Sequence, residues 1–115
     1  MRKLFFAVFI FATTVAAHAS AFWHGTVAGV AYNDVLNVRK WPSPQSRIVG
    51  SYDNGEDVSL TGRCKNPATN ISFRIDNGQS AAWKRARMQK PNVWCQVVTA
   101  EGHVGWVRGR FVLPD

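Results

Sequence analysis

The chain has 115 residues, a formal net charge of +7 at pH 7 and two cysteines. This length suits one domain near the lower end of what a single hydrophobic core stabilises. A basic balance of this size either favours anionic partners, such as acidic proteins, phosphate-rich polymers, lipid head groups or acidic glycans, or forms only a solvated surface. Beyond its N-terminal segment the sequence has no apolar run of membrane length, so we expect no membrane span.

The first nineteen residues have the pattern of a secretory signal peptide. Arg2 and Lys3 precede an apolar run over 4–17, and Ala17-His18-Ala19 has the small-x-small form of a cleavage site. A membrane anchor is the alternative reading, but this run is too short to span a bilayer. We therefore expect cleavage after Ala19, a domain at 20–115, and a periplasmic or secreted location.

Short alternating runs with turn residues between them fill most of the remaining chain. Alternation of apolar and polar residues indicates half-buried strands, and glycine, proline and asparagine mark the turns. We expect strands at 26–31, 35–39, 48–52 and 58–64, a closing hairpin of 94–99 and 104–107, and one helical turn at 109–111. This spacing predicts an all-β fold, a small barrel of about five strands.

Two short cassettes, Leu36-Asn37-Val38-Arg39-Lys40-Trp41-Pro42 and Gly102-His103-Val104-Gly105-Trp106-Val107, carry a family resemblance. They resemble the bacterial SH3-like domain, with its patterns L-N-V-R-x-x-P and G-x-x-G-W-V. The resemblance covers 26–64 and 93–113. It implies an SH3-like barrel, a binding module, and a loop at Arg39 and Pro42 that edges the binding surface. It also implies that Trp106 belongs to the core, together with Leu36, Val38, Ile48, Val58, Leu60, Val97, Val107 and Val112.

The two cysteines, Cys64 and Cys95, lie in the part expected to be exported. Exported proteins with two cysteines most often pair them, and the resembled fold places these two strands side by side. We therefore expect a disulfide. The alternative is a metal site that adds His24 or His103, but the thiols lack CxxC spacing. We expect neither a metal nor a cofactor.

The segment 65–92 stands where the resembled family has a short hairpin. Its pattern predicts a strand at 71–75, a turn at Asn77-Gly78, and a helix from Ala81 to about Gln89 with Ser80 as its N-cap. It is rich in Lys and Arg. We expect an inserted strand and short-helix flap that the barrel can lose. This flap either forms a binding surface or only covers one end of the barrel.

Candidate ligand-binding residues come from the barrel and from this flap. Trp41 is a large aromatic beside a proline, which suits either a contact surface or burial against the flap. Trp83 and Arg87 are four apart on the expected helix, so they can stack. We expect outward-facing bases on that helix. The candidate ligand-binding set is Arg39, Trp41, Tyr52, Trp83, Lys84, Arg85 and Arg87.

The sequence offers little for catalysis. Most of its carboxylates fall in expected turns, and no pair flanks a recognisable cleft. We therefore expect no enzyme, but a non-catalytic module that binds peptidoglycan or its peptide stems, the ligand that the resemblance implies. The alternatives are a protein–protein module, such as an inhibitor, adaptor or host-interacting factor, and an adhesin for acidic glycans. We expect a monomer with no nucleic-acid partner.

Overall fold

Antiparallel strands are the main elements of the computed structural model, which describes residues 23–115. The strands are β1 (Trp23–Val27), β2 (Leu36–Arg39), β3 (Ile48–Tyr52), β4 (Asp57–Asn66), β5 (Ile71–Arg74), β6 (Trp94–Val98), β7 (Val104–Arg108) and β8 (Val112–Pro114). Within the described residues, the helix α2 (Ala81–Met88) and the 3₁₀ turn η1 (Gly109–Phe111) accompany them. The predicted all-β class is confirmed, with more strands than the five expected. The expected signal peptide at 1–19 lies outside the described residues.

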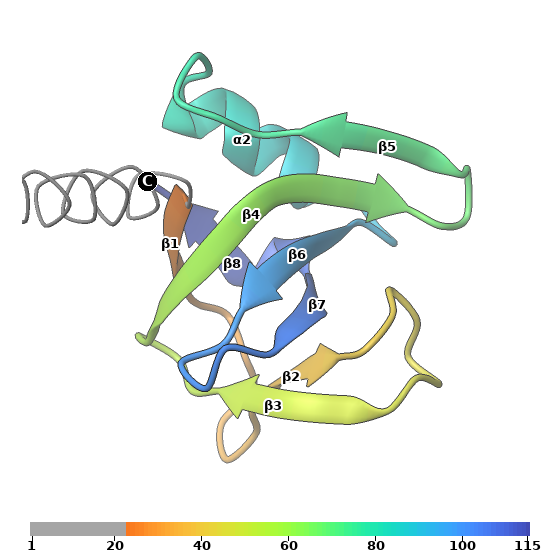
Figure 1. The fold of residues 1–115 in the computed structure, drawn as a ribbon. Helices are drawn as coiled ribbons and strands as arrows, with labels where there is room; N and C mark the ends of the chain where they lie inside the picture. Colours follow the sequence, from red (N-terminus) through yellow and green to blue (C-terminus); the bar gives the residue numbers. More distant parts are fainter. Residues whose placement is uncertain (1–22) are drawn as a thin grey trace, which may run out of the picture.

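The strands pair in the order β3-β2-β7-β6-β4-β1-β8, and β5 adds to β4 (Figure 1). Within residues 23–115, the two ends of this path, β3 and β8, are not paired with each other. The barrel expected from the sequence is therefore not closed. In the same part of the chain, no helix has the length and apolar character needed to cross a bilayer.

A bulge in β4 lets one edge of this strand pair with both β1 and β5. Residues 57–60 pair with β1, and residues 63–66 pair with β5. The register with β6 shifts between Leu60 and Cys64. Gly62 lies there at φ +97°, and a Cβ on it would come within 2.8 Å of the Ile75 carbonyl oxygen. Glycine fits this position because it has no side chain and tolerates positive φ.

The core is one cluster formed by the inward-facing residues of the strands. Val38, Val58, Leu60, Val97, Val107 and Val112 are fully buried in it, as expected. Ile48 is the exception: it is 49% exposed, because β3 ends the pairing path and the β2–β3 register shifts after Val38. Trp94 and Trp106 are buried, yet neither belongs to the core cluster. They lie on the opposite face of the sheet.

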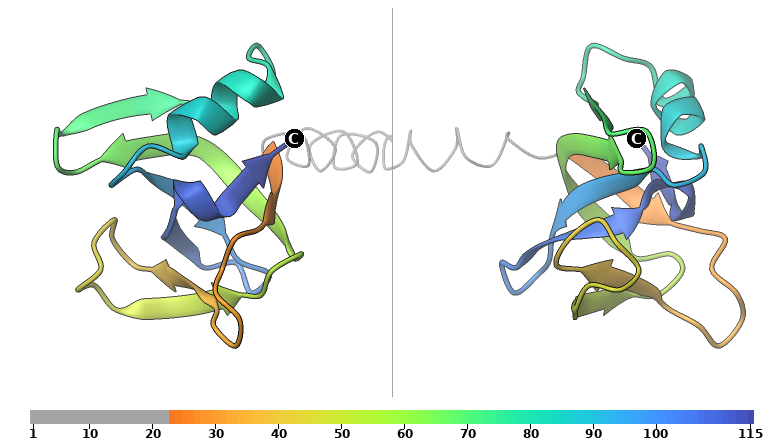
Figure 2. Two further views of the ribbon diagram at one scale, coloured as in Figure 1. Left: turned by 180° about the vertical axis from the view of Figure 1, so that it is seen from behind. Right: turned by 90° about the vertical axis from the view of Figure 1, so that its right-hand side faces the viewer.

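The inserted segment contributes to this core. Ile75 and Met88 are fully buried members of the cluster. Helix α2 packs against β8 and η1 (Figure 2), and a Cβ on Gly109 would come within 2.6 Å of the Met88 carbonyl oxygen. The inserted segment therefore supplies part of the core, and the expectation that the barrel can lose it stays a prediction.

Local sequence signals predict the bounds of α2 correctly but misplace the first strand, β1. The predicted helix is confirmed, and the Ser80 hydroxyl accepts a hydrogen bond from the Trp83 amide at 3.1 Å, as an N-cap should. The first strand, expected at 26–31, instead spans Trp23–Val27. It ends there because Gly29 adopts φ +80°, which breaks the extended conformation.

A disulfide joins Cys64 of β4 to Cys95 of β6, which confirms the predicted pairing. The two residues are direct cross-strand partners, and 31 positions separate them in the sequence. Because both thiols are oxidised, the alternative metal site is excluded. The bond fastens the base of the β4–β5 hairpin to the centre of the sheet.

Candidate functional site

A hollow lies between the β2–β3 loop and the β4–β5 hairpin. Both project from the same side of the sheet (Figure 1). The hollow has a volume of about 400 Å³. We call it the arginine–tryptophan groove, and its lining residues are Trp41, Pro42, Arg63, Cys64, Lys65, Ser72, Phe73, Arg74, Gln96 and Trp106. Its lining residues come from both the sheet and the inserted segment.

Two arginines are cross-strand neighbours on the β4–β5 hairpin, which forms one wall of the groove. Arg63 and Arg74 are direct partners in the β4–β5 pair. The Ile75 amide donates to the Gly62 carbonyl oxygen at 2.8 Å, so Arg63 and Arg74 form a non-hydrogen-bonded pair. In such pairs the Cα atoms are about 4.5 Å apart and the side chains are closest. Both arginines are exposed. Like charges placed directly opposite each other destabilise a sheet, and a bound anion would offset that repulsion.

The next pair along the hairpin extends this polar wall. Lys65 lies opposite Ser72, and both are two positions from the arginines on their own strands. Alternation therefore places all four side chains on one face of the hairpin. None of the ten residues that line the groove is acidic. The groove thus offers three positive charges and a hydroxyl to a ligand.

The opposite wall is the β2–β3 loop, which presents Trp41. This side chain is 62% exposed. The Trp41 amide donates to Ser46 Oγ at 3.2 Å, and Ser46 Oγ donates to the Trp41 carbonyl oxygen at 2.9 Å. The loop therefore holds the backbone of Trp41 and leaves its indole exposed. Of the two alternatives left open by the sequence, burial against the flap is not observed, and a role in ligand contact stays a prediction.

Arg39 braces this loop. Its Nη1 donates to the Ser46 carbonyl oxygen at 3.0 Å, and the residue is half-buried opposite Trp106. Sequence reasoning placed Arg39 in the binding set. In the structure Arg39 does not line the groove. Its guanidinium instead binds Ser46, the same residue that holds the Trp41 backbone. Its charge still lies on the face that carries the groove.

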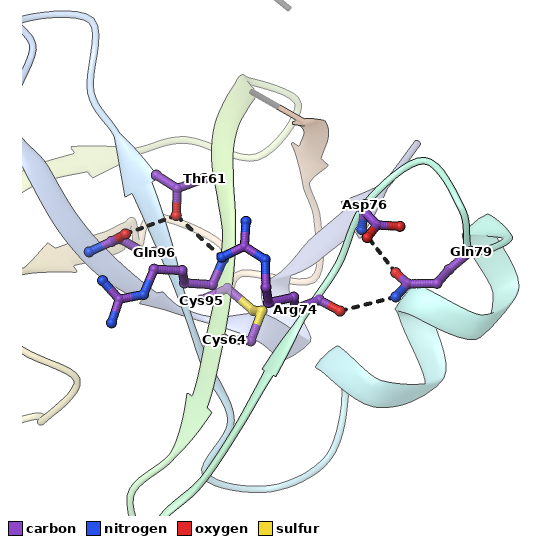
Figure 3. The surroundings of a disulfide bond; sticks show 8 residues. Thr61, Cys64, Arg74, Asp76, Gln79, Cys95 and Gln96 are labelled. Atoms are coloured by element: carbon purple, nitrogen blue, oxygen red, sulfur yellow. Dashed lines mark hydrogen bonds between the residues drawn. A yellow bond between two sulfur atoms is a disulfide. The ribbon is translucent and has the colours of Figure 1, made fainter. Parts of the chain in front are cut away.

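The floor of the groove is the centre of the sheet. Gln96 lies opposite Trp106, and the Thr61 hydroxyl donates to Gln96 Oε1 at 2.9 Å (Figure 3). The disulfide lies beside this pair, with Cys64 in the groove lining. Trp106 is 8% exposed, so the floor is polar at Gln96 and apolar at the edge of the indole.

A second hollow, of about 210 Å³, opens on the same face. Arg39, Asn37, Trp94 and Arg108 contribute to it, and the Arg108 guanidinium lies 4.8 Å from the centre of the Trp94 ring. Val35, Leu36, Pro44 and Phe111 complete its lining, so it contains no acid either.

The helix does not display the expected cationic cluster. Lys84 is only 5% exposed, because α2 packs its side against β8 and η1, so the expectation that it points outward is wrong. Arg87 stacks on Trp83 at 4.8 Å, as predicted, and also lies 5.9 Å from the Phe73 ring. Arg85 and Arg87 are exposed, as expected. None of Trp83, Lys84, Arg85 and Arg87 lines the groove.

Tyr52 does not belong to the groove. It is 8% exposed and is a member of the core cluster, so its expected role as a surface contact is wrong. It borders a different hollow, with Glu56 and Asp57. Burial raises the pKa of the Tyr52 hydroxyl, and the negative charges of Glu56 and Glu101 raise it further.

Sequence reasoning missed Arg63, Lys65 and Arg74 as site residues, although a signal was present. Two alternating runs flank the short turn 67–70, which ends in Asn70 at φ 58°. A hairpin closed by that turn pairs Asn66 with Ile71, and therefore Arg63 with Arg74. The register of the hairpin would have identified the arginine pair.

Other parts of the structure add no metal site. Within residues 23–115 no group of three or more His, Cys, Asp or Glu side chains is placed to hold a metal ion. Comparisons with known protein families, characterised proteins and solved structures gave no match. The groove itself is therefore the basis for assigning a function.

Proposed function

We propose that this chain is an exported, non-catalytic binding module of the SH3-like type. Its ligand is peptidoglycan or another anionic component of the cell envelope. One observation carries the proposal: three cations and an exposed, braced tryptophan converge on one hollow whose lining contains no acid. Cationic clefts concentrate anionic ligands, and rigid aromatic side chains add contact area at a small cost in entropy.

Two further features support the proposal. The Cys64–Cys95 disulfide suits an oxidising compartment outside the cytoplasm, which agrees with the signal peptide expected at 1–19. The SH3-like cassettes contribute directly to the site, since Trp41 and Trp106 both come from them. The free carboxylates of peptidoglycan stems are matched by arginine, which can bind a carboxylate through two parallel hydrogen bonds.

Co-sedimentation with purified cell-wall sacculi tests this function. Wild-type protein should sediment with sacculi at low salt. The double variant R63E/R74E should lose affinity by about tenfold or more, because it reverses both charges of the arginine pair. The matched control R85E/K90E makes the same change in net charge on exposed residues outside the groove, and it should bind like wild type.

Two outcomes would contradict the proposal. If wild-type protein does not sediment with sacculi at low salt, peptidoglycan is not the ligand. If R85E/K90E loses binding while R63E/R74E keeps it, the helix is the binding surface and the groove is not. Both variants should keep the fold because all four replaced side chains are exposed. Circular dichroism of each variant checks this.

A further inference from the structure

The groove and the second hollow share one face of the sheet, and two rows of cross-strand partners connect them. The first row runs across β5, β4, β6 and β7 and contains Ser72, Lys65, Trp94 and Arg108. The second runs across β6, β7, β2 and β3 and contains Gln96, Trp106, Arg39 and Ile48. Residues two apart on a strand point to the same face, so both rows face outward together.

These rows set the spacing of the charges. Lys65 and Arg108 are two strands apart, or about 10 Å at the usual strand separation. From Arg74 on β5 to Arg39 on β2 the face crosses four strand separations, or about 19 Å measured along the sheet. Arg63, Lys65 and Arg74 line the groove and Arg39 and Arg108 line the second hollow, so five cations lie on one face.

We propose that the two hollows are consecutive subsites for one extended, carboxylate-bearing glycan chain. This inference rests on the proposed binding function and specifies the ligand class of the same site. One acidic sugar unit occupies the groove, held by Arg63, Lys65 and Arg74 beside Trp41. A second acidic unit occupies the hollow at Arg39 and Arg108.

The chemistry of the face favours a glycan over an extended peptide. Strands β4, β6 and β7 at the centre of the face are each paired on both sides, so their backbone groups are already used, and β5 is the strand of the groove that leaves a free edge. A peptide that adds to a sheet needs a free edge, whereas this face recognises its ligand through side chains alone. The C–H groups of a sugar ring can pack against the negative face of an indole, such as the exposed ring of Trp41.

The same face suits a single-stranded nucleic acid less well. Base stacking needs several accessible aromatic rings along the path. Here Trp94 and Trp106 are only 4% and 8% exposed, and Arg108 lies over the Trp94 ring. Trp41 is therefore the only well-exposed ring among the aromatics that line the two hollows.

Calorimetric titration with galacturonate oligomers of defined length tests the inference. Hexagalacturonate, which reaches across both hollows, should bind about tenfold or more tightly than digalacturonate, which fills one. R63Q/R74Q should weaken both ligands. R108Q should weaken only the hexamer, and R108K, which keeps the charge, should retain most of the hexamer affinity. The control R85Q/K90Q should change neither.

Several results would overturn it. Equal affinity for the two oligomer lengths would remove the second subsite. If neutral maltohexaose binds as tightly as hexagalacturonate, the face does not recognise the charge of the ligand. Tighter binding of hexaglutamate or of a thymidine oligonucleotide would assign the face to a peptide or to a nucleic acid. Sacculus binding without galacturonate binding contradicts only this inference, and the reverse result contradicts only the peptidoglycan proposal.

Discussion

Trp41 and Tyr52 show how differently two aromatic residues can serve the same domain. Trp41 is exposed, but Ser46 fixes its backbone through two hydrogen bonds. Tyr52 is buried, and its ring belongs to the core cluster. An exposed ring on a fixed backbone has only two side-chain torsions to lose when a ligand arrives, so Trp41 suits recognition, whereas Tyr52 suits stability.

Replacement of Trp41 by alanine should weaken ligand binding without loss of stability. Removal of an exposed aromatic contact at the centre of an interface typically reduces affinity by about 2 kcal/mol or more, mainly through faster dissociation. Surface plasmon resonance on immobilised sacculus fragments gives both rates. Tyr32→Ala is the control, because Tyr32 is 93% exposed and does not line the groove. An unchanged dissociation rate for W41A would exclude the loop from the site.

Tyr52 should make the protein less stable at alkaline pH. The folded state raises the pKa of its hydroxyl above the ordinary value of 10.0, through burial and then through Glu56 and Glu101. The unfolded state therefore loses this proton first, and the stability that depends on it is complete below pH 10 and falls as pH rises toward the folded pKa. Urea unfolding at pH 8 and pH 11 should show a smaller pH-dependent loss for Tyr52→Phe. An equal loss in both proteins would contradict this assignment.

At the scale of elements, the inserted segment has two separable parts. Helix α2 and the residue that follows β5 supply core side chains, since Met88 and Ile75 are fully buried. The β4–β5 hairpin supplies the arginine pair of the groove. The Gln79 side chain joins the two parts, because it donates to the Arg74 carbonyl oxygen and accepts from the Asp76 amide (Figure 3).

Met88→Ala should therefore destabilise the whole domain. Truncation of a fully buried methionine costs about 2–5 kcal/mol. Alanine has the higher helix propensity, so any loss must come from packing against the core. Chemical unfolding measures the change, with Ile71→Ala as the control because Ile71 is 59% exposed on β5. If M88A and I71A are equally stable, the helix is not part of the cooperative core.

The disulfide acts on the same elements. It closes a loop across 31 positions between β4 and β6. Loss of the bond from a small domain typically costs about 2–5 kcal/mol. We expect no free thiol in the denatured, unreduced protein, and we expect Cys64→Ser/Cys95→Ser to lower the melting temperature. Two labelled thiols in the unreduced protein, or an unchanged melting temperature, would contradict this.

At the scale of the domain, the hollows of the described residues differ in charge. Five cations line the two hollows of one face, whereas Glu56 and Asp57 line the hollow at Tyr52. An anionic ligand is therefore attracted to the two cationic hollows and not to the hollow at Tyr52. Such asymmetry acts mainly on the rate and orientation of encounter.

The association rate with an anionic ligand should consequently fall as salt rises. At physiological ionic strength the screening length is about 8 Å, shorter than the path across the cationic face. Stopped-flow binding of fluorescent hexagalacturonate at low and high salt measures this dependence. R63E/R74E should flatten it more than the equally charged control R85E/K90E. A salt dependence that is identical in the two variants would show that only net charge matters.

Sequence predicts those features here that depend on neighbouring residues. The Ser80 cap, the alternation at Val58 and Leu60, and the cysteine pairing all follow from local pattern or from the resembled strand order. Lys84 is buried because α2 packs against β8 and η1. The sequence of the helix alone does not determine which of its sides makes this contact. Arg63 meets Arg74 only in one hairpin register, and a slip of one residue would turn both side chains to the other face.

The two outward rows draw residues from strands far apart in the sequence, from Arg39 on β2 to Arg108 on β7. Any fluctuation that lifts β2 or β5 from the sheet therefore dismantles the path for the ligand. A ligand that binds only the intact face stabilises every pairing at once, by about 2.7 kcal/mol at a hundred times its dissociation constant. Amide exchange should then slow across the whole sheet, and not only at the residues that the ligand touches.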